Sequence, residues 1–421
     1  MTTGLAWSMD TYLRDLPVID CHEHTMLPDR RPEPLDVGTL IAGSDLGDDL
    51  IACGMPAADR QRLSFEVAAP WLDRVRNTGF YRSIVLALES LFGYEGDLAS
   101  AADWDDVSLA LIDANARDDW YDEVLGRRGH IERILRIQGD EPHPFDIPRQ
   151  WFDPIVRFDD WITTSDGTER ETLAASVGGR AGTLDEFLAA MEAAFDAAVE
   201  GGAVGAKSML AYRRSLAHGR PARGEAARLF TRRTPDECEA TALQDFLLHA
   251  AVDMAGRRSL PYQIHVGIGS WQRDVAANAN PLLLGPLIEA HRDTTFVLLH
   301  GGYPFIDEMA ALAKTHPNVV LECGWLAYIG PTSYRRAMTE WLDAVPASKL
   351  LAFGADCQYV EQTLGALLLT RRLLASALEA KVHESDWSAT LAESVARRVL
   401  ADNAREVYRL REGGAEPRID D

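Results

Sequence analysis

The sequence predicts an α/β fold, and more narrowly a closed (β/α)8 TIM barrel with a helical insertion after its first strand. Short, nearly all-apolar runs alternate with amphipathic helical segments along most of the 421 residues. This alternation is typical of a parallel sheet covered by helices, and eight such runs suit a closed barrel. A doubly wound open sheet is the alternative, but no Gly-x-Gly-x-x-Gly motif follows any of the runs.

The eight predicted strands are short and spread over the whole chain. They are residues 16–21, 131–137, 154–158, 204–210, 261–266, 295–300, 319–323 and 350–353. Only the second and third lack a clear helical segment between them. The rhythm of the remaining strands is regular, which favours βα units in sequence.

The predicted helices lie between these strands and after the last one. They are residues 102–125, 184–200, 240–255, 281–291, 306–314 and 334–344, with two more closing the chain, the second near 388–409. Residues 184–200 are rich in alanine, the strongest helix former, and Gly201-Gly202 is a typical helix end.

Residues 26–130 are predicted to form a mainly helical insertion. A turn-rich stretch, 28–34, opens it, and it is long for a simple strand-to-helix connection. Long ordered insertions often cover an active site. We expect residues 1–412 to form a single barrel domain and the acidic residues 413–421 to be a disordered tail.

Composition limits the binding partners and the cellular compartment that we expect for the chain. A formal net charge of −23 argues against general binding to nucleic acid or to an anionic membrane. The N-terminal residues lack a signal-peptide pattern, and no apolar stretch approaches the roughly 20 residues that cross a bilayer. The five cysteines are dispersed without CxxC spacing, which fits free thiols in a reducing cytoplasm.

Two histidines one residue apart, His22 and His24, follow the first predicted strand. Side chains at positions i and i+2 point to the same side of a strand, so two imidazoles would converge there. Such a pair makes half of a divalent-metal site. A His-x-His pair alone is weak support for metal binding, because the chain has 11 histidines.

Later segments supply the residues that strengthen this interpretation. His265 and His300 end the fifth and sixth strands, Lys207 lies in the fourth, and Asp356 follows the eighth. In a barrel the carboxyl ends of all strands meet on one face. Each residue has a structural alternative, a hydrogen-bonded histidine or a lysine paired to a carboxylate, but the joint coincidence predicts a metal site.

This set of residues resembles the amidohydrolase superfamily. Three phrases more narrowly resemble its amidohydrolase 2 branch, which includes domains associated with glutamine-synthetase-like proteins. They are residues 205–208 continuing to 211–213, residues 299–305, and residues 402–404. The branch is similar also to decarboxylases and uronate isomerases, so the resemblance does not define a substrate.

The resemblance implies a role for each site residue. His22, His24 and His265 would bind the metal, and Asp356 would be a further ligand that takes a proton from water. His300 would bind a second metal or hydrogen-bond the reacting group of the substrate.

Lys207 stands where binuclear members carry a carboxylated lysine, whereas mononuclear members do without that bridge. The number of metal ions, one or two, therefore stays open. We favour one, because the branch's decarboxylases use one. Zinc is the first choice for imidazole plus carboxylate ligands, with manganese as the alternative.

The segment after the fourth strand is rich in arginine. Its members are Arg213, Arg214, Arg220, Arg223, Arg228, Arg232 and Arg233. Arg213, beside Tyr212, is our candidate for a bidentate grip on a substrate carboxylate. A solvated loop or a subunit contact is the better interpretation for most of the others. Trp325 and Gln358, which follow the seventh and eighth strands, are candidates to line the pocket.

Three functional hypotheses result. The first is an enzyme, a metal-dependent hydrolase of an amide or related C–N bond in a small carboxylated substrate. The second keeps the metal but performs non-oxidative decarboxylation or uronate-type isomerisation. The third is a non-catalytic barrel that binds a small acid or a protein partner. The apolar and arginine-rich loops are compatible with a homodimer.

Overall fold

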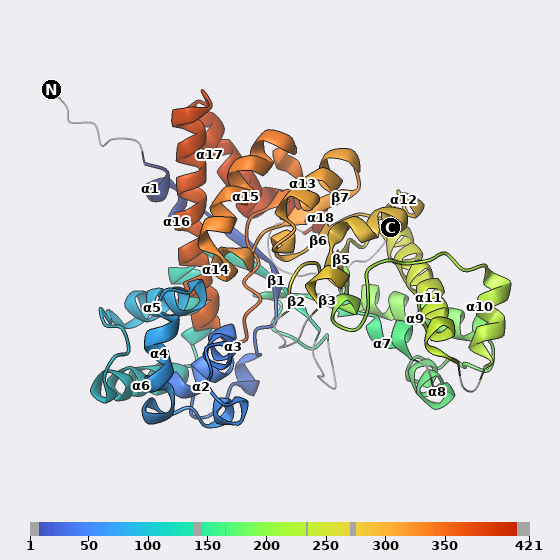
Figure 1. Ribbon diagram of the computed structural model, residues 1–421, viewed down its shortest axis with the longest axis horizontal. Coiled ribbons are helices and arrows are strands. Elements are labelled where there is room, and N and C mark those ends of the chain that lie inside the picture. Colours follow the sequence, from blue (N-terminus) through green and yellow to red (C-terminus); the bar gives the residue numbers. More distant parts are fainter. Residues whose placement is uncertain (1–7, 139–144, 165, 233–234, 270–274, 411–421) are drawn as a thin grey trace. The chain divides into compact units, whose positions relative to one another are not determined.

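The computed structural model describes residues 8–138, 145–164, 166–232, 235–269 and 275–410, drawn as coloured ribbon in Figure 1. The predicted acidic tail, 413–421, lies outside the described residues. Among those residues, no helix is long and apolar enough to cross a membrane.

Eight strands form one sheet in the order in which they occur along the chain. They are β1 (Val18–Glu23), β2 (Ile131–Ile137), β3 (Phe152–Arg157), β4 (Gly205–Ser208), β5 (Tyr262–Ile264), β6 (Phe296–Leu298), β7 (Val319–Glu322) and β8 (Leu350–Leu351). β1 pairs with β2 in parallel, and β3 to β7 form a continuous series of parallel pairs. After β8, the carbonyl of Phe353 accepts from the amide of Cys21 at 3.1 Å, which joins the end of the sheet to β1. The predicted (β/α)8 barrel is confirmed.

The first strand differs from its predicted bounds. β1 begins at Val18 and ends at Glu23, and all six of its residues are buried. Its register places Glu23 opposite Arg136 of β2. His22 therefore lies within the strand rather than after it, and only His24 follows the last strand residue.

The chain folds into two compact units. The first comprises Met1–Arg136, Gly269–Asp274 and Glu322–Ala404. The second comprises Ile137–Ile268, Val275–Leu321 and Arg405–Asp421.

The helices of the first unit begin with α1 (Met9–Leu13) and continue between β1 and β2 as a packed group, blue to teal in Figure 1. This group consists of α2 (Val37–Ala42), α3 (Asp45–Ala52), α4 (Phe65–Val75), α5 (Gly79–Phe92) and α6 (Ala101–Asn115), with short turns η1 (Pro28–Arg30), η2 (Ala57–Arg62) and η3 (Asp122–Arg128). Its apolar side chains, among them Leu40, Leu50, Leu72 and Leu111, pack into one core, which Tyr359 joins from the segment after β8. The segment between β1 and β2 is thus mainly helical and internally packed.

The helix predicted over 102–125 ends early, at Asn115. The Asn115 amide donates to Leu111 O at 3.1 Å and to Glu361 Oε1 at 2.9 Å, and Trp120 Nε1 donates to the same Glu361 oxygen at 2.6 Å. Asparagine that bonds to the backbone in this way competes with helix continuation. Helical structure resumes at Asp122 as the π-helical turn η3.

The C-terminal part of the first unit is also helical. It contains α14 (Leu326–Ile329), α15 (Pro331–Ala344), η8 (Ala347–Lys349), α16 (Val360–Glu384), α17 (Ala389–Arg397), η9 (Arg398–Asp402) and the start of α18 (Asn403–Tyr408). α16 packs against α5. The single helix predicted near 388–409 is thus interrupted by the π-helical turn η9.

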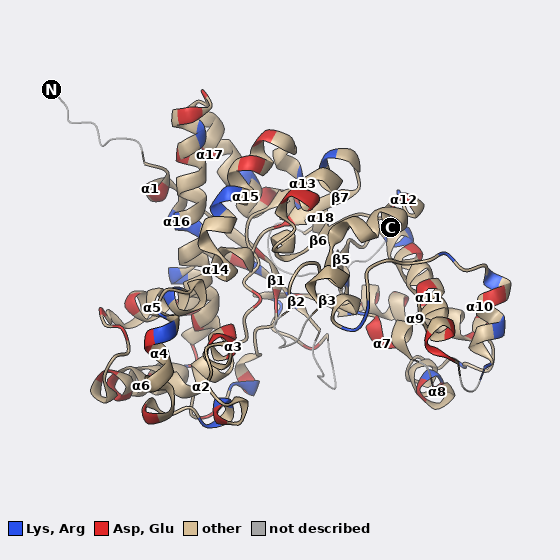
Figure 2. Ribbon diagram, viewed as in Figure 1, with Lys and Arg blue, Asp and Glu red and all other residues tan. Residues whose placement is uncertain are grey.

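The second unit carries the helices that follow β3 to β6. They are α7 (Asp159–Thr163), α8 (Gly167–Ser176), α9 (Leu184–Glu200), α10 (Arg223–Phe230), α11 (Glu237–Arg257), α12 (Gly285–Ala290) and α13 (Ile306–Thr315), with the turns η4 (Leu210–Tyr212), η5 (Ala276–Ala279), η6 (Pro281–Leu284) and η7 (His300–Gly302). Capping boxes begin both long helices, through Thr183 and Glu186 in α9 and through Asp236 and Glu239 in α11. Figure 2 shows acidic residues distributed over these helices rather than gathered in one patch.

The close approach of α16 to α5 depends on Gly365. A Cβ at position 365 would fall against the carbonyl oxygen of Ser83, well inside van der Waals contact. Alanine normally stabilises a helix interior relative to glycine, but here the clash outweighs that preference. We expect Gly365→Ala to lower the stability by about 2 kcal/mol, measured as a fall in Tm of several degrees. Gly224→Ala in α10, where no atom lies within 4 Å of the new Cβ, is the matched control and should leave Tm unchanged or slightly raised.

Candidate metal centre

Two imidazoles and one carboxylate converge at the end of β1. Nε2 of His22 and Nε2 of His24 each lie 3.4 Å from Oδ1 of Asp356. The side chain of His22 is buried, whereas those of His24 and Asp356 are 33% and 16% exposed. The point at which they meet is therefore enclosed on one side and accessible on the other, as a catalytic metal site requires.

The backbone around Asp356 is held against β1. The Asp356 amide donates to His22 O at 3.0 Å, and the Ala355 amide donates to Oδ1 of Asp20 at 3.1 Å. Oδ1 of Asp20 also accepts from the His22 amide at 3.2 Å. Asp356 has a φ of +52°, a conformation that non-glycine residues keep only where the surroundings impose it.

Glu23, between the two histidines, is fully buried and accepts three hydrogen bonds. Its donors are the amide of His24 at 2.8 Å, the amide of Cys357 at 2.5 Å and Oγ1 of Thr363 at 2.9 Å. Burial, together with the charge of Asp20, raises the pKa of Glu23 well above its usual range, and burial raises the pKa of Asp20 to about 7. These contacts fix the direction of the strand end that carries the imidazoles.

The helical segment between β1 and β2 contributes a further carboxyl group. Oδ2 of Asp45, the first residue of α3, accepts from Nε1 of Trp325 at 2.9 Å. Burial, followed by the charge of Asp356, raises the pKa of Asp45 to about 7. The sequence indicated Trp325 but not Asp45, because an aspartate at the start of a helix is explained by helix capping and the helix dipole alone.

Gln358, the other predicted pocket residue of this unit, is exposed. Its backbone amide donates to Oε1 of Gln362 at 3.3 Å, and its backbone carbonyl accepts from the Met26 amide at 2.9 Å.

In the second unit, His265 lies against two other rings. Its centroid is 4.7 Å from that of His300 and 4.4 Å from that of Tyr212. Both histidines are buried. Nε2 of His265 lies 3.1 Å from the carbonyl of Ile268, and because a carbonyl can only accept, Nε2 carries the proton. Nδ1 of His265 is then the nitrogen that keeps a lone pair.

Lys207 is buried in β4, opposite Arg157 of β3 and Gln263 of β5 in the strand register. Nearby, Asp159 accepts from Oγ of Ser208 and from the Met209 amide, both at 2.9 Å. Burial raises the pKa of Asp159, against the opposing effects of these hydrogen bonds and of the charges of Arg157 and Lys207. The sequence analysis missed Arg157 and Asp159, although both stand where β3 ends.

Arg213 is exposed and donates through Nη1 to Oγ1 of Thr163 at 3.0 Å. Several other members of its arginine-rich segment pair with nearby carboxylates: Arg214 with Asp245, Arg223 with Asp185, and Arg228 and Arg232 with Glu239. Arg233 lies outside the described residues. Most of the described arginines of this segment therefore form ion pairs with nearby carboxylates.

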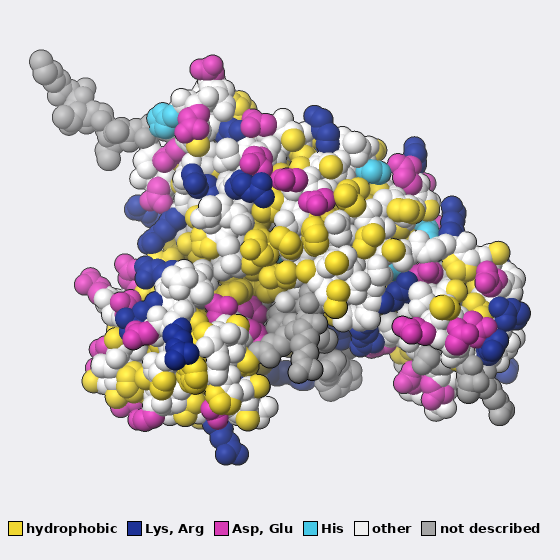
Figure 3. Space-filling model, viewed as in Figure 1, with side chains coloured by type: hydrophobic (Ala, Val, Ile, Leu, Met, Phe, Trp, Pro, Cys, Tyr) yellow, Lys and Arg dark blue, Asp and Glu magenta, His cyan; other side chains and the backbone are white. Residues whose placement is uncertain are grey.

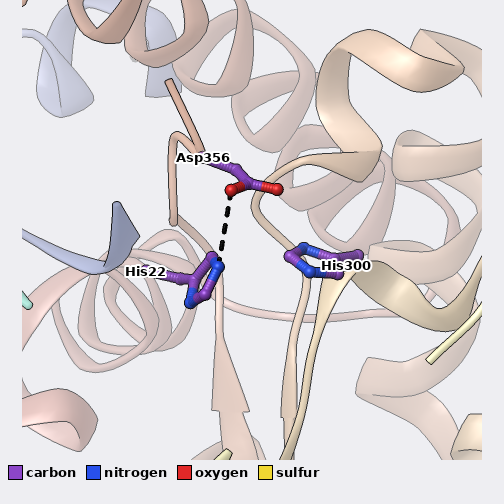
Figure 4. Close-up of side chains that lie close together, drawn as sticks. All are labelled: His22, His300 and Asp356. Carbon is purple, nitrogen blue, oxygen red and sulfur yellow. Dashed lines mark ion pairs between the residues drawn. The ribbon is translucent and has the colours of Figure 1, made fainter. Parts of the chain in front are cut away.

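The donor atoms fit a metal ion. Figure 4 draws the side chains of His22 and Asp356 from the first unit, joined by their ion pair, together with that of His300. Ligands about 2.0–2.2 Å from one zinc ion stand roughly 3–4 Å apart. The distances of 3.4 Å from the Asp356 oxygen to the two imidazoles fall in that range.

Comparison with known proteins gives one family and several relatives. The model of a family described as Amidohydrolase matches residues 166–410. Protein fluG of Emericella nidulans is 26% identical over 355 residues, which are 75% of this chain and 39% of that protein. The chain thus spans well under half the length of this curated relative.

Two solved structures share the fold over nearly their whole length. One, from Lactobacillus casei and described as a metal-dependent hydrolase, is 19% identical with a TM-score of 0.65, covering 96% of this chain and 97% of the other. The other, glucuronate isomerase from Caulobacter crescentus, is 17% identical with a TM-score of 0.78, covering 95% and 93%.

The two hydrogen bonds accepted by Asp159 lead to a prediction about the end of β4. Asp159→Asn replaces one of the two accepting oxygens by an NH2 group, so one of the two hydrogen bonds, to Ser208 or to Met209, loses its acceptor. We expect a loss of about 1–3 kcal/mol in stability, seen as a lower midpoint of thermal unfolding followed by circular dichroism. Asp160→Asn makes the same chemical change at the exposed neighbouring position and should cost no more than about 0.5 kcal/mol. Equal losses in the two variants would contradict the assigned role of Asp159.

Proposed function

The chain belongs to the amidohydrolase family, and on that basis we propose that it is a metal-dependent hydrolase that cleaves an amide or related C–N bond of a small carboxylated substrate. One observation carries the proposal. Two imidazole nitrogens, from His22 and His24, lie 3.4 Å from the same oxygen of Asp356, at an accessible position.

We assign His22, His24, His265 and Asp356 as the ligands of one divalent ion, zinc before manganese. Such an ion lowers the pKa of a water molecule and polarises a carbonyl group. The hydrogen bond between Nε2 of His265 and Ile268 supports its assignment, because it leaves Nδ1 as the coordinating atom. In this arrangement Lys207 stays an amine, and a second ion would require its carboxylation.

Asp356 is proposed to move the proton. Its partial exposure gives it access to both substrate and water, so it can accept a proton from the attacking water and pass it to the leaving amine. The backbone bond to His22 holds its carboxylate in place for both transfers. His300 is proposed to donate a hydrogen bond to the carbonyl oxygen as negative charge develops on it.

The substrate pocket is proposed to use Tyr212, Trp325 and Gln358. Tyr212 packs on the ring of His265, and Asp45 holds the indole of Trp325. For the substrate carboxylate, Arg157 is a better candidate than Arg213. Arg157 ends β3 opposite Lys207, whereas Arg213 is exposed and bonded to Thr163.

A second candidate reaction is isomerisation of a uronate-type sugar acid or decarboxylation by the same residues. This second candidate is supported by the range of proteins that share the fold, since one of them is a glucuronate isomerase. We further propose a cytoplasmic enzyme in which residues 1–412 act as one domain. The five cysteines, all among the described residues, form no disulfide bonds, which supports that compartment.

Metal content is the first test. Protein purified without chelators or added metal should hold about one zinc or manganese per chain by elemental analysis. His22→Ala should lose that metal while keeping its circular dichroism spectrum, and His383→Gln, at an exposed position on α16, should keep it. About two ions per chain would favour a carboxylated Lys207. A value near zero that added metal cannot raise would contradict the proposal.

Product analysis tests the reaction. With a panel of small carboxylated amides, mass spectrometry should show a product pair whose combined mass exceeds the substrate by one water. Asp356→Asn should lower kcat/KM by about 10²–10⁴-fold, the range for loss of a general acid–base group. A product of unchanged mass from sugar acids, or release of carbon dioxide, would replace hydrolysis by the second candidate.

A further inference from the structure

A groove of about 510 Å³ lies on the second unit, apart from the residues assigned above. It is lined by α9, by α11, by the segment that contains Arg220 and by His291 after α12. Histidine side chains reach the surface near α12 in Figure 3. The proposed hydrolase uses none of these residues.

Two histidines meet in this groove. Nδ1 of His249 lies 2.7 Å from Nε2 of His291, and Nε2 of His249 lies 3.1 Å from the carbonyl of Gly219. The carbonyl can only accept, so Nε2 of His249 carries its proton and Nδ1 keeps a lone pair. His291 must then donate from Nε2 to that lone pair.

Both imidazoles are neutral at physiological pH. Burial, with the charge of His249 next, lowers the pKa of His291 to about 4. Burial also lowers the pKa of His249, opposed by its hydrogen bond to Gly219 and by Asp245 and helped by the positive charge of Arg220. Neutral imidazole is the form that binds metals.

This protonation state distinguishes two kinds of ligand. An anion needs free N–H donors, but the N–H of His249 is bonded to Gly219 and the N–H of His291 to His249. A cation needs lone pairs aimed at one point, and a change of tautomer at His291 supplies the second of them. The pair is therefore suited to a metal ion rather than to an anion.

We propose that His249 and His291 bind Zn²⁺ through Nδ1 and Nε2, at a site distinct from the barrel centre. The proton on Nε2 of His291 moves through solvent to Nδ1, so both rings stay neutral and no proton is released. The two nitrogens, now 2.7 Å apart, separate by about half an ångström to reach tetrahedral spacing.

Asp253 is the third ligand in this proposal, with water completing the shell. It follows His249 by one helical turn on α11 and lines the same groove. Its carboxylate now forms an ion pair with Arg257, with Oδ2 at 3.1 Å from Nε. Arg257 also pairs with Glu192, so it keeps a carboxylate partner when Asp253 turns to the ion.

The positive charge of Arg220 is expected to weaken the binding of a cation in this groove. It is exposed, lines the groove, and its charge lowers the pKa of both histidines. Arg223 lines the groove as well, but it is paired with Asp185. Removing the charge at position 220 should therefore tighten zinc binding, which a merely structural histidine pair would not show.

The test is a calorimetric titration of the full chain with Zn²⁺ at pH 7.4, after the barrel site has been filled. One further equivalent is expected, with the same heat in two buffers of different ionisation enthalpy because no proton is released. His249→Gln and His291→Gln should each lose this equivalent, whereas His383→Gln should keep it. His22→Ala should also keep it, so that failure at the barrel centre and failure in the groove are distinguishable.

A charge variant completes the test. Arg220→Gln should bind the groove zinc about threefold to tenfold more tightly, and Asp253→Asn should bind it more weakly. Zinc binding that survives in both histidine variants overturns the proposal, as does a wild-type chain that takes up no further equivalent. If inorganic phosphate binds instead and Arg220→Gln abolishes that binding, the groove is an anion site and the proposal is wrong.

Discussion

The placement of His24 and Asp356 depends on the hydrogen bonds that the buried carboxyl group of Glu23 accepts. Its three donors come from β1, from the segment after β8 and from α16. Without it, the amides of His24 and Cys357 would lose their acceptor in or near the interior, at a cost of about 1–3 kcal/mol for each buried unsatisfied group. One side chain thus joins the first strand to the last and places His24 and Asp356 on the same side.

Around this group, the first unit gathers carboxyls where water is largely excluded. Asp20 and Glu23 are fully buried, and Asp45 is held by Trp325. Burial raises the pKa of each, and in each case the negative charge of Asp356 raises it further. A divalent cation among such groups would reverse that effect, because its charge favours their ionised forms. The charge distribution and the donor geometry therefore support the same proposal.

The sequence predicted the barrel because strand and helix periods are local properties, and the strand order follows from right-handed βα connections. It also predicted that His22, His24 and Asp356 converge, since strand ends share one face. It did not predict Asp45, whose partner Trp325 lies 280 residues away. Nor did it find Arg157, because charge density drew attention to the segment of Arg213, where most side chains are paired locally. The helices α7, α8 and α10 were missed because 5, 10 and 8 residues are too few to show a helical period clearly.

The contact between Asp45 and Trp325 has an evolutionary consequence. The helical segment between β1 and β2 packs on itself, on Tyr359 and on α16, and no strand residue belongs to its core. Through this one hydrogen bond, however, it sets the orientation of an indole that follows β7. Selection for a new substrate could act on this segment alone, leaving the ends of the strands unchanged. The two positions should then covary among relatives, and the segment between β1 and β2 should diverge faster than the barrel that carries the histidines.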